Sequence, residues 1–342
     1  MMPCGAHWKH SLLKTRIQMT KDQLKIVFFG TPDFAVESLD ALVREGFNIA
    51  AVVTMPDKAA GRGQKISFSA VKKYALEHDL PLLQPVKLKD PEFIEQLRAV
   101  GADLFIVIAF RMLPEVVWAM PPLGTFNLHA ALLPRYRGAA PINWAVINGD
   151  SETGVTTFFL DNDIDTGDII SRERIEIGPD ENAGSVHDRL MCLGAALTVD
   201  TVRHIIAGDL QTTPQSELTE ETTPTPAPKI FKNDCRIDWQ KSGAAVHNHV
   251  RGLSPYPAAW SELFAGDENH GPVKVLATAK NDNAPLLSPG ELALVGKLAF
   301  VGTGNGTLQL LSVQPAAKRP MDAADWLRGM RPGQNGIKYS LK

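Results

Sequence analysis

The chain has 342 residues, of which 44% are hydrophobic and 21% are charged, and its formal net charge is −3. This is the composition of an ordinary globular protein, and the length is sufficient for two domains with separate cores. No run of eighteen apolar residues is present, so we predict neither a membrane span nor a membrane partner.

The first 23 residues precede any strand or helix pattern. Their only apolar cluster, Leu12-Leu13, is too short for the core of a signal peptide, and a second Met stands at position 19. We predict that residues 1–23 are a disordered N-terminal extension that precedes the folded domain.

The three cysteines, Cys4, Cys192 and Cys235, are odd in number and lack the spacing of a metal site. This favours reduced thiols in a cytoplasmic protein. Cys192 lies among apolar residues of a helical stretch, and we expect it to pack in the core.

Between residues 24 and 148, apolar strand patterns alternate with helical patterns. The expected strands are 24–30, 49–53, 81–83, 103–109 and 125–129. The expected helices are 33–45, 67–78, 91–100 and 139–148. Continuous apolar runs of this kind are typical of parallel strands buried on both faces. We therefore predict an α/β fold with a doubly wound, Rossmann-like parallel sheet.

The pattern changes after residue 149. Two longer strands, 155–160 and 169–177, flank a polar turn, and a long helix at 183–207 closes the domain. Residues 211–228 are rich in Thr, Pro and Glu, as linkers are. Short strands around a helix at 242–253 then fit a small OB-like β-barrel. The predicted first domain, linker and second domain are 24–209, 210–228 and 229–342.

Charge is distributed unevenly between these parts. Residues 1–228 carry 21 Lys and Arg against 29 Asp and Glu, whereas residues 229–342 carry 14 against nine. A basic second domain favours a polyanionic partner. Its candidate phosphate contacts are Lys229, Lys232, Arg236, Arg251, Lys318 and Arg319. The sequence leaves open which of them share a face.

Gly30 ends the first strand, where a dinucleotide-binding fold carries its glycine-rich loop. The residues that follow are Thr31, Pro32, Asp33 and Phe34, without a second or third glycine. The dinucleotide fingerprint is therefore not met, which disfavours an NAD-dependent enzyme.

Asn127 and His129 are two residues apart on a predicted strand, so their side chains project from the same face. They stand at its carboxyl end, where open α/β sheets place their ligands. Taken alone, either residue has an alternative interpretation as a structural polar group with satisfied hydrogen bonds. The unusual loop that follows, from Leu132 to Pro141, favours a functional site.

Two motifs carry a family resemblance. The first is Asn-x-His-x-x-Leu-Leu-Pro from Asn127, followed by Arg-x-Arg-Gly-Ala-Ala-Pro-Ile from Arg135, and the second is Leu160 to Asp168 with Asp165 before Thr-Gly. Together they resemble the signatures of the 10-formyltetrahydrofolate-dependent formyltransferases. The resemblance covers about residues 24–332.

The resemblance implies roles for these residues. Asn127, His129 and Asp165 would be catalytic, with His129 hydrogen-bonded to Asp165. The loop Ala131, Leu132, Leu133 and Pro134 would bind 10-formyltetrahydrofolate, the formyl donor. No metal site is implied, and His247 and His249, two apart on a predicted helix, do not share a face for one.

Further segments resemble the branch of the family that formylates methionyl-tRNA. They are 27–35, 55–65, 236–239, 255–260 and 314–318. The resemblance implies that initiator methionyl-tRNA is the formyl acceptor, and that Arg62, with Lys58 and Lys65, contacts it. The second domain would then bind tRNA. We expect a cytoplasmic monomer.

One position departs from the family pattern. Ala131 stands where relatives usually carry Ser, so a hydroxyl that would bond the cofactor or order the loop is missing. We expect a modest loss, about 1 kcal/mol for one net hydrogen bond.

Two alternatives stay open at this point. The first is a formyltransferase for a small amine, such as an amino sugar nucleotide or glycinamide ribonucleotide. The second domain, 229–342, argues against the glycinamide enzyme, which resembles a single domain. The sugar enzyme has a second domain too, so the segment Gly61-Arg62-Gly63 is what discriminates against it. The second is a tRNA-binding protein without catalysis, for which Ala131 is the only indication.

Overall fold

The computed structural model describes residues 19–60, 65–218, 223–330 and 338–342. Its contacts divide the chain into two compact units that do not follow chain order. The first unit comprises the chain up to Pro134, Val155–Glu173 and Leu190–Thr223. The second unit comprises Arg135–Gly154, Arg174–Arg189 and Pro224–Lys342. Because these units divide the chain differently from the domains expected above, the limits 24–209, 210–228 and 229–342 stay a prediction.

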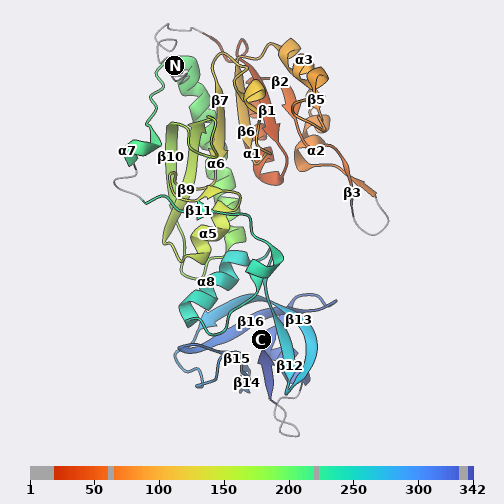
Figure 1. Cartoon of the computed structure of the whole chain (residues 1–342), viewed down its shortest axis with the longest axis vertical. Coiled ribbons are helices and arrows are strands. Elements are labelled where there is room, and N and C mark those ends of the chain that lie inside the picture. The colour runs from red at the N-terminus through yellow and green to blue at the C-terminus, as the bar shows by residue number, and fades with distance from the viewer. Residues whose placement is uncertain (1–18, 61–64, 219–222, 331–337) are drawn as a thin grey trace, which may run out of the picture. The chain divides into compact units, whose positions relative to one another are not determined.

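A seven-stranded sheet organises the amino-terminal part of the chain (Figure 1). Its strand order is β10-β9-β7-β6-β1-β2-β5. Their bounds are Ile169–Glu176, Glu152–Phe159, Thr125–His129, Leu104–Ile108, Lys25–Gly30, Asn48–Val53 and Leu82–Leu83. The five strands from β7 to β5 pair in parallel, whereas β7 and β9 are antiparallel. The expected doubly wound parallel sheet is confirmed, with an antiparallel edge.

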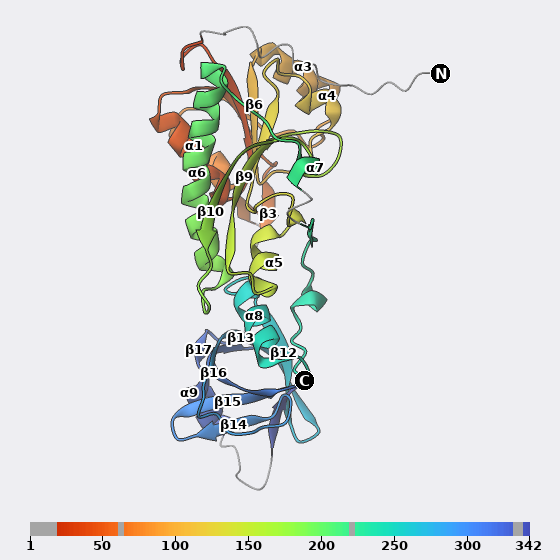
Figure 2. The ribbon, with the colours of Figure 1, turned by 90° about the vertical axis from the view of Figure 1, so that its left-hand side faces the viewer.

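Helices cover both faces of this sheet, with α1 and α6 on one side and α3 and α4 on the other (Figure 2). The helices α1 to α4 are Asp33–Arg44, Ala70–Glu77, Pro91–Val100 and Glu115–Trp118, and α6 is Ala183–Ala207. Val27 and Phe29 of β1 pack towards α3 and α4. Alternate β1 residues such as Phe28 are also fully buried. Burial on both faces explains why these strands are continuous apolar runs.

Helix starts in this part follow the sequence closely. Ser69 caps α2, because its hydroxyl accepts a hydrogen bond from the backbone of Lys72 at 3.0 Å. Asp90 caps α3 in the same way through Glu92, and Pro91 stands at the first helical position. Such caps satisfy backbone N–H groups that have no partner within the helix.

The helix α6 is long and apolar enough to cross a membrane by length and composition alone. Half of its most apolar stretch is buried inside the protein, and core helices of soluble proteins meet the same criterion. Gly194 packs this helix against β7, since a Cβ there would lie 2.7 Å from a methyl group of Leu128. The feature therefore fits a packed core helix.

The carboxyl-terminal part forms an antiparallel sheet in the order β14-β15-β16-β13-β12-β18, with β17 paired to β16. In chain order, β12 to β18 are Ala259–Ala265, Glu268–Lys280, Leu292–Val295, Leu298–Thr303, Gly306–Pro315, Met321–Asp322 and Tyr339–Leu341. A bridge between Glu291 and Ser340 joins the two edges, and Leu341 donates to the carbonyl of Gly290 at 2.8 Å. The sheet thus closes on itself as a barrel, and its OB-like character stays a prediction.

The helix α8, Gly243–Leu253, packs in the second unit against α5, Pro141–Ile147. Gly252 permits this contact, because a Cβ there would meet the Ile147 backbone at 2.8 Å. The Asn143 side chain donates to the Gly252 carbonyl at 2.8 Å. This packing explains why residues 135–154 belong to the same unit as the barrel.

Two buried polar side chains of α8 reach the turn before α6. Arg251 donates to the carbonyls of Gly178 and Glu181, at 3.2 and 2.9 Å, and is only 6% exposed. His247 contacts the Pro179 carbonyl at 3.3 Å and the hydroxyl of Thr278 at 3.0 Å. The sequence-based assignment of Arg251 as a candidate phosphate contact is therefore wrong, because its guanidinium is enclosed.

Other expectations have mixed outcomes. Cys192 is exposed, so its predicted place in the core is wrong, whereas Cys235 is buried. Most of the predicted extension, residues 1–18, lies outside the described residues. Lys21 is ordered by a 3.0 Å ion pair with Glu45.

The remaining elements were not predicted. They are α7 Gln215–Leu218, α9 Ala323–Met330, the 3-10 helix Lys232–Cys235, β3 Lys58–Ala60, β4 Lys65–Ser67, β8 Arg137–Gly138 and β11 Pro226–Ala227. Two of them, α7 and β11, lie in the segment expected to be a linker.

We predict that Glu181 stabilises the turn before α6 in a pH-dependent way. Burial alone raises the pKa of Glu181, but hydrogen bonds from Gly178, Ser185 and Arg189 outweigh it and hold the pKa below 4.5. Its contribution is therefore complete above pH 4.5 and is lost as the pH falls through the lowered pKa. Glu181→Gln should reduce the free energy of unfolding by about 1–3 kcal/mol at pH 7.

Urea unfolding of both proteins at pH 7 and pH 3.5 tests this, with the exposed Glu173→Gln as the control. The difference should shrink at pH 3.5. A difference that does not depend on pH contradicts the assignment.

Candidate active site

The candidate site lies at the carboxyl end of β7, beside the point where the strand order reverses between β1 and β6. In doubly wound sheets this reversal is where ligands bind. Asn127 pairs with Val107 of β6 on one side and with Phe158 of β9 on the other, and His129 pairs with Thr156. The predicted strand 125–129 has the predicted bounds.

Asp165 is brought to His129 from a separate loop. Its Oδ2 lies 3.8 Å from Nδ1 of His129, and the two side chains are 13% and 7% exposed. This separation allows an ion pair but is longer than the expected direct hydrogen bond. Catalytic contacts are often long before substrate binds. The rings of His129 and Phe158 also make a T-shaped contact, with their centroids 6.4 Å apart.

Asn127 is half-buried on the same strand face. No side chain or backbone group of the described ranges, 19–60, 65–218, 223–330 and 338–342, hydrogen-bonds to its side-chain amide. A half-buried amide without a protein partner retains its donors for a ligand.

The loop that carries Asp165 is tightly specified. Asp161 accepts hydrogen bonds from the hydroxyl of Thr166 at 2.6 Å and from the backbone of Asp163 at 3.2 Å. Gly167 lies so close to the carbonyl of Phe159 that a Cβ would be 1.7 Å from its oxygen, so no other residue fits. Asp165 itself has a positive φ of 56°, a conformation that non-glycine residues seldom adopt.

The expected folate loop is fixed by the buried Thr156 of β9. Its hydroxyl donates to the Ala131 carbonyl at 2.6 Å and accepts from the Leu133 backbone at 3.2 Å. Leu133 packs with Phe158, and its carbonyl accepts from Arg172 at 3.1 Å. Neither Thr156 nor Arg172 belongs to a recognisable motif, because their roles depend on strand pairing.

The side chains of the predicted folate residues differ in exposure. Ala131, Leu133 and Pro134 are buried, and Leu132 is half-buried. Since the Ala131 side chain is 0% exposed, a serine hydroxyl at this position would face the protein interior. This favours loop ordering over a direct cofactor bond as the missing contribution.

The predicted tRNA contacts lie partly outside the described structure. Arg62 falls outside the described residues. Lys58 and Lys65 begin the two short antiparallel strands β3 and β4, paired from Lys58 with Ser67 to Ala60 with Lys65. The backbone on either side of residues 61–64 thus forms two paired antiparallel strands, a feature that the sequence did not predict.

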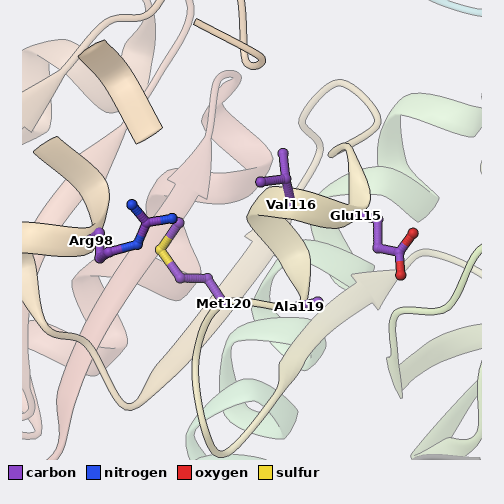
Figure 3. Close-up of a pocket in the computed structure, with 5 residues that line it drawn as sticks. All are labelled: Arg98, Glu115, Val116, Ala119 and Met120. Carbon is purple, nitrogen blue, oxygen red and sulfur yellow. The ribbon is translucent and has the colours of Figure 1, made fainter. Parts of the chain in front are cut away.

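A surface pocket elsewhere on the first unit is lined by Arg98, Glu115, Val116, Ala119 and Met120 (Figure 3). None of the candidate residues contributes to it. Within the part of the chain that the structure describes, no group of three or more His, Cys, Asp or Glu side chains is arranged to hold a metal ion.

Comparisons with known proteins identify the family. "Formyl transferase" matches residues 24–202, and "Formyl transferase, C-terminal domain" matches residues 229–331. Methionyl-tRNA formyltransferase of Bacteroides fragilis is 54% identical over 312 residues, which are 91% of this chain and 96% of that protein. The chain belongs to the methionyl-tRNA formyltransferase family. The family resemblance seen in the motifs is thereby confirmed.

Other comparisons agree with membership of the methionyl-tRNA formyltransferase family. The enzyme of Flavobacterium johnsoniae is 50% identical over 90% of this chain and 97% of its own length. Among solved structures, the sugar 3N-formyl transferase WlaRD has a TM-score of 0.61 at 18% identity, covering 86% of this chain and 99% of its own. HypX from Aquifex aeolicus in complex with tetrahydrofolic acid has a TM-score of 0.60 at 17% identity. The match covers 88% of this chain and 46% of the HypX chain. These two structures support the fold.

We predict that Thr156 holds the folate loop of this family member. Thr156→Val keeps the shape but leaves the Leu133 N–H and the Ala131 carbonyl without their partner, which costs about 1–3 kcal/mol for a buried polar group. Thermal unfolding should show the loss, and the KM for 10-formyltetrahydrofolate should rise.

Thr156→Ser, which retains the hydroxyl, is the matched control and should stay near the wild type in folate KM. Equal folate KM values for the two variants would exclude this role for the hydroxyl.

Proposed function

We propose that Asn127, His129 and Asp165 catalyse transfer of the formyl group of 10-formyltetrahydrofolate to the α-amine of methionyl-initiator-tRNA. The observation that carries this proposal is the convergence at the end of β7 of a buried imidazole, a carboxylate and an amide that has no partner among the described residues. Sequence identities of 50–54% to methionyl-tRNA formyltransferases favour this acceptor over an amino sugar.

The chemistry requires three kinds of group. The neutral α-amine attacks the formyl carbon, so that a C–N bond forms and the carbonyl oxygen becomes negative. The tetrahedral intermediate then collapses as the bond to N10 breaks, and the proton lost by the amine balances the one gained by N10. This direct transfer needs no covalent intermediate with the protein and no metal.

Asn127 is placed to stabilise the oxyanion. Its amide is fixed on a strand, has no competing partner among the described residues and shares a face with His129. A preorganised donor of this kind acts only as charge develops, which is why its loss typically costs about 10²–10³ in rate.

His129 and Asp165 are placed to manage protons. The Asp165 carboxylate, whose Oδ2 lies 3.8 Å from Nδ1 of His129, orients the imidazole. His129 can then donate to the oxyanion or to the leaving N10, and Asp165 is a candidate acceptor for the proton of the attacking amine.

The barrel surface offers a site for the tRNA backbone. Lys232 and Arg236 both lie over the ring of Trp260, at 5.5 and 5.6 Å from its centroid. Lys229 lies 5.5 Å from the centroid of Phe231, a side chain that is 61% exposed. Cations held over aromatic faces attract phosphates, and an exposed ring stacks on bases. We assign tRNA binding to this group, the Trp260 surface, as well as to Arg62, Lys58 and Lys65.

We further propose that the protein is a cytoplasmic monomer. Its domains in this proposal are a catalytic domain at 24–209 and a tRNA-binding domain at 229–342. In this proposal the loop from Ala131 to Pro134 of the catalytic domain binds the folate.

The acceptor is tested with labelled 10-formyltetrahydrofolate and three acceptors. These are methionyl-initiator-tRNA, elongator methionyl-tRNA and UDP-amino-arabinose. Label should appear on the initiator tRNA. Transfer to the sugar alone would overturn the proposal.

We predict that Asn127→Ala lowers kcat by about 10²–10³ and that Asp165→Ala lowers it by about 10²–10⁴. Single-turnover formylation with saturating substrates measures both effects. Asn162→Ala is the matched control, because Asn162 is an exposed residue of the Asp165 loop. Full turnover by Asn127→Ala or Asp165→Ala would refute the assigned roles.

We predict that the double variant Lys232→Ala with Arg236→Ala weakens tRNA binding and reduces the salt dependence of the binding constant. The slope of log K against log salt should fall by about one for each phosphate contact removed. Lys318→Ala with Arg319→Ala is the control, matched in charge and exposed on the surface. Equal slopes for both double variants would show that the Trp260 surface has no special role.

A further inference from the structure

A buried glutamine lies in the polar segment that precedes the second domain. Gln215 begins the short helix α7 and is only 3% exposed, although its neighbours Ser216 and Glu217 are exposed. Its side-chain Nε2 donates to the carbonyl of Asp165 at 3.0 Å and to the carbonyl of Gly167 at 2.8 Å. One amide thus holds the backbone on both sides of Thr166, in the loop that presents the catalytic carboxylate.

The direction of these bonds follows from chemistry. Both partners are backbone carbonyls, which only accept, so the NH2 end of the amide must face them. Both of its protons are therefore used. Burying an amide without such bonds is costly, so the two bonds account for the burial of Gln215.

The segment around Gln215 is anchored without this side chain. Thr213 and Ile169 exchange two backbone hydrogen bonds, at 2.8 and 2.9 Å. Leu218 packs against the cluster formed by Leu133, Phe158 and Ile169. The two bonds from Gln215 are therefore available for holding the Asp165 loop.

Asp165 needs this support because of its backbone. Its φ of 56° lies in the left-handed region, where a non-glycine residue costs about 1–2 kcal/mol. Such a conformation persists only when neighbouring contacts determine it. Gly167 and Asp161 fix the rest of the loop, and Gln215 fixes the carbonyl of Asp165 itself.

We propose that Gln215 is a positioning residue for the reaction, which acts through Asp165. This inference rests on the proposed function, in which the Asp165 carboxylate faces His129. Two hydrogen bonds to the peptide groups around Asp165 set the direction of its side chain. Without them the residue relaxes towards an ordinary backbone conformation, and the carboxylate moves away from the imidazole.

Gln215→Met tests the proposal, because methionine has similar length and no donor. We expect kcat to fall roughly ten- to a hundred-fold, the loss typical of a displacement of about 1 Å at a reacting group. The KM values for 10-formyltetrahydrofolate and for methionyl-tRNA should stay within about twofold of the wild type. Glu217→Gln, two residues away in the same short helix and exposed, is the matched control and should have unchanged kcat.

A double-variant cycle separates positioning from mere structural support. If Gln215 acts through Asp165, then Gln215→Met combined with Asp165→Ala should be no slower than Asp165→Ala alone. Independent, multiplying losses would overturn the proposal. Full turnover by Asp165→Ala alone would instead refute the proposed function, so the two failures are distinguishable.

Gln215→Glu gives a second readout should the methionine variant fail to fold. The introduced carboxylate places lone pairs against two carbonyls, whereas its protonated form restores one donor. The kcat of this variant relative to the wild type should therefore rise as the pH falls from 8 to 6. A ratio that does not change with pH while kcat is depressed would contradict the proposal.

Discussion

The antiparallel pairing of β7 with β9 brings together the two motifs on which the site depends. It sets His129 opposite Thr156 and Asn127 opposite Phe158. From that register, β9 supplies the Thr156 hydroxyl that fixes the loop 131–134, the Phe158 ring that contacts His129, and the Phe159 carbonyl that confines Gly167. A shift of one residue would turn each side chain of β9 to the other face.

Backbone carbonyls recur as the groups that are held in place. The carbonyls of Ala131 and Leu133 accept hydrogen bonds in the proposed folate loop, and those of Asp165 and Gly167 accept hydrogen bonds in the loop of the proposed catalytic carboxylate. Loops at a reacting centre lack the hydrogen-bond ladder of a strand, so their carbonyls require side-chain donors. The Asn127 amide, by contrast, has no hydrogen-bond partner among the described residues, which supports its proposed role towards the substrate.

In the second unit, too, side-chain donors bind the backbone carbonyls of a loop. Arg251 and His247 lie almost fully buried in α8 because they bond the carbonyls of Gly178, Pro179 and Glu181. Lys232 and Arg236 remain exposed instead, and both lie over the ring of Trp260. The basic residues of the second domain thus divide into a structural group and an exposed group, a division that charge counting does not predict.

The sequence by itself determined the main strands and helices of the first domain, the doubly wound class and the strand 125–129, because continuous apolar runs, caps and turns are local signals. It also identified the formyltransferase motifs, whose residue types are dictated by the reaction. Only the tertiary structure decided which distant groups complete the site. Thr156 and Gln215 are ordinary polar residues in the sequence, and Arg251 resembles any surface cation. Their roles arise from pairing and burial between segments far apart in the chain, which leave no local pattern.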